Sequence, residues 1–192
     1  MKSTDADKQE RVFAVMEFEE KTLSVENIYD GKVIKVRKEQ VELPDGRTSM
    51  RELIGHPGGV GVIAVDENRQ VFMVSQYRIA ARSMMLEIPA GKLEYGENPL
   101  ECGKRELIEE TGYEAKEFTH LGAYYATPGY CEEILNIYLA KDLKFVGQNL
   151  DDGEFLNVKK YDIDELYTMV MNNEIHDAKT AIAILKAKAI LG

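Results

Sequence analysis

Alternating apolar and polar positions mark the first part of the chain. Between residues 21 and 77, short apolar runs recur at 34–36, 41–43, 60–65 and 71–74, a pattern typical of β-strands. Turn-forming residues separate the runs at 30–31, 44–46 and 66–68, and the first two turns contain glycine. This region therefore predicts an antiparallel or mixed sheet.

The apolar period changes to a helical one after Asn98. Asn98 is suited to cap a helix, and Pro99 is suited to its first turn. Apolar or small residues at 100, 103, 107 and 111 then fall on one face. Gly112 can end the helix in a left-handed conformation. We expect a helix over residues 98–111.

The rest of the chain returns to strands and then ends in helices. Strand-like segments lie at 118–126, 134–140 and 155–158, and a loop containing Pro and Gly, 127–132, separates the first two. Helical periodicity follows at 163–172 and 177–191. The chain therefore combines strands with three predicted helices.

Hydrophobic patterning restarts after the break at residues 56–59, where His, Pro and two Gly follow one another. A chain of 192 residues is long enough for one domain with a sizeable core and a small appended unit. We therefore expect residues 1–53 to form an N-terminal tail and a small antiparallel β subdomain. Residues 54–192 would form the main domain.

Composition narrows the classes of function. The net charge of −10 and the acidic pI near 4.9 argue against sequence-independent binding to nucleic acid. No apolar run approaches the length of a membrane span, and the first ten residues lack the pattern of a secretory signal. Cys102 and Cys131 are too few for a disulfide framework, so we expect free thiols and a cytoplasmic location.

Acidic side chains concentrate on the helix expected over 98–111. Glu106, Glu109 and Glu110 stand at positions i, i+3 and i+4, so their carboxylates converge on one face. Their repulsion costs stability unless a cation relieves it, and hard oxygen ligands favour Mg²⁺, Mn²⁺ or Ca²⁺. An isolated acidic run of this kind is usually a solvated helix face. Here it belongs to a longer pattern that also contains glycines at fixed offsets.

That longer pattern resembles the signature box of the Nudix family. The box is Gly, five residues, Glu, seven residues, Arg-Glu, an aliphatic, any residue, Glu-Glu, any residue, Gly and an aliphatic. Residues 91–113 match every polar and glycine position, and Tyr113 stands where an aliphatic is commoner. The resemblance implies the Nudix α/β/α sandwich with a mixed sheet, in addition to the N-terminal β subdomain. It also implies hydrolysis of a diphosphate with Mg²⁺, or alternatively Mn²⁺, as cofactor.

The resemblance also implies roles for individual residues. Glu106 and Glu110 correspond to the principal metal ligands, assisted by Glu109 and by the backbone carbonyl of Ala90. Arg105 and Glu97 would orient these carboxylates. We group Arg105 and Glu109 with the catalytic residues.

Segments outside the box are similar to the ADP-ribose pyrophosphatase branch of that family. These segments are 76–78, 87–91 and 128–133, and a proline at 128 lies fifteen residues after the end of the box, which is the hallmark of the branch. The similarity implies cleavage of ADP-ribose to AMP and ribose 5-phosphate. Glu133, in preference to Glu132, would activate the attacking water. The branch also forms homodimers through its N-terminal strands, so we expect a homodimer.

Substrate binding by an acidic protein requires local cations. Arg51 and Arg78 lie in segments that match the branch and can bind phosphate bidentately. Glu87 is a further candidate substrate-binding residue, and Arg82 is a weaker one. Aromatic side chains such as Phe18 and Tyr29 could stack on adenine. We rank this role below a place in the core, which is commoner for aromatic residues at strand positions.

Alternative functions remain open from the sequence. Another diphosphate could be the substrate, such as GDP-mannose or another sugar nucleotide, a dinucleoside polyphosphate or a damaged nucleoside triphosphate. A non-catalytic regulator that senses a nucleotide is a different class, but such proteins usually lose box carboxylates. His56, His120 and His176 show no metal-ligand spacing, so none enters the expected mechanism. Cys131 has no basic partner in sequence and is not expected to be a nucleophile.

Overall fold

The computed structural model describes residues 18–150, 153 and 155–192, and the N-terminal tail expected within residues 1–53 falls mostly outside them. The elements follow the expected order of strands, one helix, more strands and two helices. They are β1 (Lys21–Asp30), β2 (Lys35–Glu42), β3 (Thr48–Gly55), β4 (Gly59–Ala64), β5 (Gln70–Arg78), β6 (Ser83–Glu87), β7 (Ala90–Lys92), α1 (Pro99–Thr111), β8 (Tyr113–Tyr125), β9 (Ile134–Phe145), β10 (Leu156–Asp162), α2 (Ile163–Met171) and α3 (Ala178–Leu191).

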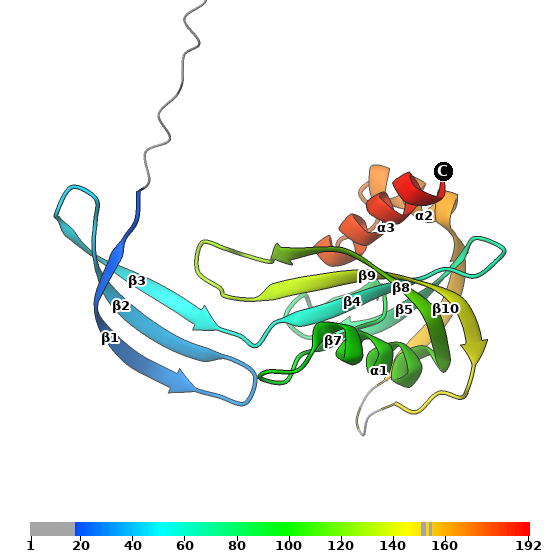
Figure 1. Cartoon of the computed structure of the whole chain (residues 1–192), viewed down its shortest axis with the longest axis horizontal. Helices are drawn as coiled ribbons and strands as arrows, with labels where there is room; N and C mark the ends of the chain where they lie inside the picture. Colours follow the sequence, from blue (N-terminus) through cyan, green and yellow to red (C-terminus); the bar gives the residue numbers. More distant parts are fainter. Residues whose placement is uncertain (1–17, 151–152, 154) are drawn as a thin grey trace, which may run out of the picture.

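The strands of the described residues form three sheets. β1, β2 and β3 make an antiparallel sheet, and β10, β5 and β6 make another. The third sheet has the order β7-β4-β9-β8, in which β4 runs parallel to β9 and the other pairs are antiparallel. Helix α1 lies on one side of these strands and α2 and α3 lie on the other (Figure 1). The expected sandwich around a mixed sheet, with a small N-terminal antiparallel sheet, is confirmed.

Strand β4 is buried on both faces, which explains its uninterrupted apolar sequence. Val60 and Val62 point to the core under α1, where they meet Leu107. Ile63 points the opposite way, to the core under α2 and α3, where it joins Ile184. One strand therefore holds both helical layers in place.

Helix α1 begins and ends where its sequence predicts. The side chain of Asn98 accepts hydrogen bonds from the backbone N–H groups of the first turn, and Pro99 follows it. Gly112 adopts a left-handed φ of 77° and its N–H donates to Ile108. Gly103 faces β4 so closely that a Cβ would lie 3.0 Å from Val60. The helix is thus fixed at both ends and pressed against the central sheet.

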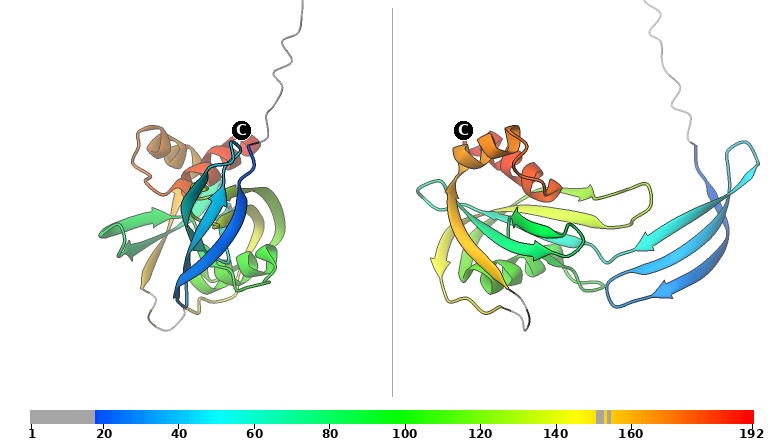
Figure 2. Two further views of the ribbon diagram at one scale, coloured as in Figure 1. Left: turned by 90° about the vertical axis from the view of Figure 1, so that its left-hand side faces the viewer. Right: turned by 180° about the vertical axis from the view of Figure 1, so that it is seen from behind.

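The N-terminal sheet extends away from the sandwich formed by the remaining strands and the helices (Figure 2). Every residue of β1 is exposed. The sheet nonetheless touches the body at the end of β3, where the Ile54 N–H donates to the Tyr130 carbonyl at 2.7 Å and the Ile54 carbonyl accepts from the Glu132 N–H at 2.9 Å. The sheet thereby supports the loop between β8 and β9. Among the helices of the described residues, none is long and apolar enough to cross a membrane.

Candidate active site

Two adjoining cavities lie where β4, β5, β7 and α1 meet. The first has a volume of about 630 Å³ and is lined mainly by charged residues. The second has a volume of about 540 Å³ and has more apolar lining, including Ala80, Met85 and Leu135. Four residues line both cavities, and we call this shared lining the common floor. These residues are Arg78, Ala90, Gly91 and Lys92.

The predicted metal ligands meet in the first cavity. Glu106 and Glu110 both line it, and so does Ala90 at the start of β7. Glu110 is almost fully buried, and its Oε2 accepts a hydrogen bond from the Ala90 N–H at 3.0 Å. That bond ties the helix that bears the carboxylates to the strand that bears the candidate carbonyl ligand.

Gly91 makes room for one of these carboxylates. A Cβ at this position would overlap the carboxylate of Glu106. A side chain at this position of the sequence box would therefore force the Glu106 side chain to move. This packing brings the carboxylate of Glu106 directly against the backbone that follows Ala90.

Arg105 links three glutamates beside the same cavity. Its Nη1 lies 2.8 Å from Glu106 Oε1 and 2.8 Å from Glu109 Oε2, and its Nη2 lies 3.4 Å from Glu97 Oε1. Partial burial alone would lower the pKa of Arg105, but the charges of Glu106 and Glu109 outweigh it and raise the pKa. Glu97 also accepts from the Glu94 N–H at 2.9 Å, and this bond and Arg105 lower its pKa. This geometry suits Arg105 and Glu97 for orienting carboxylates.

Glu106, Glu110 and the Ala90 carbonyl fit a hard divalent cation. All three are oxygen donors, and Gly91 leaves a cradle that a side chain would fill. Within the described ranges, no three Asp, Glu, His or Cys side chains gather closely enough to enclose a metal. One or two carboxylates completed by substrate phosphate and water are the usual protein contribution to a Mg²⁺ site.

Arg78 and Glu87 form a bidentate ion pair next to this centre. Arg78 donates through Nε to Glu87 Oε1 at 2.7 Å and through Nη2 to Glu87 Oε2 at 2.8 Å. The carboxylate of Glu87 is 2% exposed, so its burial raises its pKa, but Arg78 and Lys179 more than offset this and lower the pKa to about 2. Glu87 is therefore ionised and already bound by protein cations, whereas Arg78 faces both cavities.

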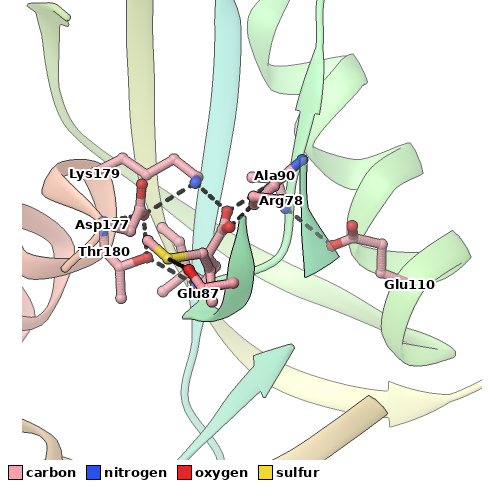
Figure 3. Close-up of polar contacts among 10 residues, drawn as sticks. Arg78, Glu87, Ala90, Glu110, Asp177, Lys179 and Thr180 are labelled. Carbon is pink, nitrogen blue, oxygen red and sulfur yellow. Dashed lines mark hydrogen bonds and ion pairs between the residues drawn. The ribbon is translucent and has the colours of Figure 1, made fainter. Parts of the chain in front are cut away.

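The second partner of Glu87 comes from the other end of the chain. Lys179, in the first turn of α3, donates to Glu87 Oε2 and also lies 2.9 Å from Asp177 Oδ2. Lys179 and Asp177 both line the second cavity, and Figure 3 shows the contacts of Lys179 with Asp177 and with Glu87. The sequence analysis assigned neither of them a role. The contact of Lys179 with Glu87 joins positions 92 residues apart, which no local pattern of the sequence indicates.

The loop after β8 separates its two glutamates. Glu132 forms an ion pair with Arg37 of β2, on the N-terminal sheet. Glu133 instead lines the second cavity, where its Oε1 lies 3.7 Å from His56 Nδ1. His56 Nδ1 also accepts from the Gly58 N–H at 3.1 Å. Of the two glutamates, Glu133 is the one placed at the candidate site.

Several predicted residues lie elsewhere in this chain. Arg51 is on β3, pairs with Glu20 and lines neither cavity. The weaker candidates Arg82, Phe18 and Tyr29 also lie outside both cavities. Outside them too are the residues to which the sequence analysis gave no role, His120, His176 and Cys131. Two lysines that it did not single out, Lys32 and Lys92, line the first cavity.

The arrangement can perform a hydrolysis at phosphorus. Carboxylates for a divalent ion, the Arg78 guanidinium and a carboxylate at Glu133 surround two joined cavities. Phosphoryl transfer requires charge neutralisation and a positioned water, and it requires little covalent chemistry from the protein. A buried nucleophile is not indicated, since burial raises the pKa of the Cys102 thiol to about 12.

Comparison with known proteins agrees with this chemistry. Residues 55–182 match the NUDIX domain family, and residues 20–54 match the nucleoside diphosphate sugar hydrolase N-terminal domain family. The chain is 45% identical over 168 residues to the ADP-ribose pyrophosphatase of Bacillus subtilis (strain 168), covering 86% of this chain and 91% of that protein. It is 43% identical over 169 residues to the methanol dehydrogenase activator of Bacillus methanolicus, with coverage of 87% and 91%.

A solved structure is similar as well. The crystal structure of an ADP compounds hydrolase superimposes with a TM-score of 0.78 over 90% of this chain and 94% of that one. The sequence identity is 22%, so this likeness concerns the fold.

Proposed function

This chain belongs to the NUDIX family, and from that premise we propose that it hydrolyses the diphosphate of ADP-ribose to AMP and ribose 5-phosphate, with Mg²⁺ as its cofactor and Mn²⁺ as an alternative. The observation that carries the proposal is the joining of two cavities over a floor that contains Arg78 and Ala90, with Glu106 and Glu110 beside it. The substrate assignment is supported by the relative that is named an ADP-ribose pyrophosphatase and is 45% identical to this chain.

Glu106, Glu110 and the Ala90 carbonyl would hold the divalent ion. When bound, the ion neutralises the diphosphate charge and acts as a Lewis acid toward the phosphoryl oxygens. Arg105 keeps Glu106 in place through their ion pair, and the Ala90 N–H does the same for Glu110. These contacts hold the ligands before substrate arrives, which reduces the cost of reorganisation.

Glu133 is the proposed general base. It takes a proton from the attacking water while the new P–O bond forms, and the bridging oxygen leaves with the other phosphate. Its loop is held by the backbone hydrogen bonds to Ile54. His56 lies beside it, with Nδ1 3.7 Å from Glu133 Oε1.

The common floor of the two cavities is the proposed position of the diphosphate. Arg78 binds Glu87 through Nε and Nη2 and lines both cavities, so its guanidinium is placed to meet a phosphate oxygen as well. Lys32 and Lys92 add positive charge to the first cavity, and neither forms an ion pair within the described ranges. The second cavity, with its alanines and Met85, suits the less polar part of the substrate.

We further propose a homodimer formed through the N-terminal sheet, with residues 1–53 as the dimerisation unit and 54–192 as the hydrolase domain. The exposed apolar residues of β1, such as Val25 and Ile28, support this assembly because nothing in the described part of the chain covers them. Arg51 lies away from its own cavities, so a substrate contact by Arg51 requires a second copy. Free thiols at Cys102 and Cys131 support a reducing, cytoplasmic location.

Product analysis tests the proposed reaction. Purified protein is incubated with Mg²⁺ and with ADP-ribose, GDP-mannose, diadenosine polyphosphates or nucleoside triphosphates, beside the Glu110→Gln variant. The expected result is AMP and ribose 5-phosphate, formed preferentially from ADP-ribose and lost in the variant. Preferential cleavage of another compound would keep the chemistry and reject the substrate. An absence of metal-dependent cleavage would favour a regulator that binds nucleotides.

A further inference from the structure

The start of helix α3 is attached to the active site by polar contacts that extend beyond the ion pair already described. The Ile88 N–H donates to Thr180 Oγ1 at 3.0 Å, and Thr180 Oγ1 donates to Asp177 Oδ2 at 2.5 Å. Asp177 also caps α3 by accepting from the Thr180 N–H at 3.0 Å. The first turn of α3 therefore binds both the side chain of Glu87 and the backbone of the next residue.

The segment between Glu87 and Ala90 transmits this attachment to the catalytic centre. Glu87 contacts α3 at one end, and the Ala90 N–H contacts Glu110 on α1 at the other. Figure 3 shows Lys179 and Arg78 on either side of the Glu87 carboxylate, with Ala90 and Glu110 beyond them. A displacement at the start of α3 would therefore reach the residues that face the substrate.

Charge explains why Glu87 requires two cations. Its carboxylate is 2% exposed, and an ionised group so buried must be paired and hydrogen-bonded. Arg78 and Lys179 supply three hydrogen bonds to its two oxygens. The Lys179 side chain is itself 11% exposed and is shared with Asp177. If Lys179 were neutral, Arg78 would be the remaining cation on Glu87 among these contacts.

We propose that Lys179 is a positioning residue that orients Arg78 for diphosphate binding by sharing the Glu87 carboxylate with it. The proposal rests on the hydrolase function proposed above and deepens it. Lys179 neutralises part of the negative charge of Glu87 and so weakens the attraction of Glu87 for Arg78. The ion pair of Lys179 with Asp177 fixes the position of Lys179, and through it the position of the Glu87 carboxylate. Arg78 is thereby held where it lines both cavities and is not drawn wholly onto Glu87.

Replacement of Lys179 by Met tests this role, because Met keeps much of the aliphatic stem that passes near Gly61 and removes the charge. We expect KM for the diphosphate substrate to rise about tenfold, while kcat changes by less than roughly threefold. Lys179→Arg should restore most of the affinity. The matched control is Lys186→Met on the same helix, where Lys186 contacts the Tyr124 hydroxyl at 2.8 Å; this variant should keep the KM of the wild type.

A double-mutant cycle with Arg78→Gln separates positioning from direct contact with substrate. If Lys179 acts through Arg78, Lys179→Met adds little to the KM of Arg78→Gln. Full additivity, a loss confined to kcat, or an unchanged KM in a folded Lys179→Met protein would each overturn the proposal. If Lys179→Met does not fold, Lys179→Gln takes its place, since its amide can still donate to Glu87.

The measurement uses whichever compound of the diphosphate panel the wild type cleaves best. A wrong substrate assignment therefore leaves this test intact, because Arg78 faces the phosphates that all these compounds share. Thermal melting of each variant accompanies the kinetics. A purely structural role would lower the melting temperature of Lys179→Met without the dependence of KM on Arg78.

Discussion

Strands β1 and β4 both contain branched apolar residues but have opposite surroundings. Every residue of β4 is buried, whereas every residue of β1 is exposed, including Val25 and Ile28 at 54% and 50%. The difference arises because helices cover both faces of β4, while no helix or second sheet among the described residues covers the N-terminal sheet. Apolar sequence therefore marks a core in one region and an uncovered surface in the other.

The two regions also contribute differently to the candidate site. The region around β4, which helices cover and which we call the covered region, supplies the carboxylates of α1 together with Arg78 and Lys179, all from helices or strands. The N-terminal sheet supplies Lys32 at the edge of the first cavity and holds the catalytic loop through Arg37 and Ile54. We infer that the covered region carries the chemistry and that the N-terminal sheet adjusts and completes it. Each prediction below challenges this division.

The largest effect is expected in the covered region, at Glu110. Glu110→Gln removes a charge from the proposed metal site while keeping the acceptor for the Ala90 N–H. We expect kcat to fall roughly a thousandfold, equivalent to about 4 kcal/mol, with little change in melting temperature. Steady-state kinetics measures the effect. Glu101→Gln on the exposed side of α1 is the control, and a Glu110→Gln enzyme within tenfold of the wild type would contradict the assignment.

Glu87 should matter for stability more than any exposed carboxylate. Its pKa in the folded protein is about 2, below the usual 4.5, so its charge stabilises the fold in full above pH 4.5, and this contribution is lost as the pH falls toward 2. Glu87→Gln should lower the free energy of unfolding by about 3 kcal/mol near neutral pH, and by less in acid.

Urea unfolding at several pH values measures this difference. The control is Glu114→Gln, whose exposed pair with Lys144 should contribute under about 1 kcal/mol. Equal destabilisation of Glu87→Gln at pH 7 and in strong acid would show that its charge is not responsible.

The loop glutamates test where the two regions meet. Glu133 faces the second cavity, whereas Glu132 pairs with Arg37 on the N-terminal sheet. We expect Glu133→Gln to lower kcat roughly a hundredfold, as loss of a general base does, and Glu132→Gln to lower it less than about threefold. The pH dependence of kcat for both variants completes the measurement. The reverse ranking would move the base to Glu132.

The smallest effect on the catalytic step is expected from charges on β1. Val25→Asp combined with Ile28→Asp should convert a dimer to a monomer, as measured by light scattering, because both side chains belong to the uncovered apolar surface. The covered region should keep its fold, and activity should fall about tenfold through loss of the Arg51 of the second copy. Glu26→Gln on the same strand is the control. A wild type that is already monomeric would refute the assembly.

Much of the fold was predictable because its signals are local. Asn98 and Gly112 mark the ends of α1 through their own hydrogen-bonding and φ preferences, and the predicted helices over 163–172 and 177–191 correspond to α2 and α3. The carboxylates of α1 also followed from helical spacing, although Glu110 turned out to be buried while Glu109 pairs with Arg105 outside the cavity lining. Spacing predicts a shared side of a helix but not the depth of each side chain.

The periods of apolar residues and the caps were enough to predict the three helices and most of the strands, because these depend on contacts within a few residues, although β6 and β7 were not predicted. The class of chemistry followed from the resemblance of residues 91–113 to the Nudix box. Contacts between distant segments required the folded chain. Lys179 reaches Glu87 across 92 positions of sequence, His56 reaches Glu133, and Arg51 lies away from the cavities of its own chain. Such pairings are set by how the strands and helices pack, and no local pattern of residues encodes which distant charge a buried carboxylate will meet.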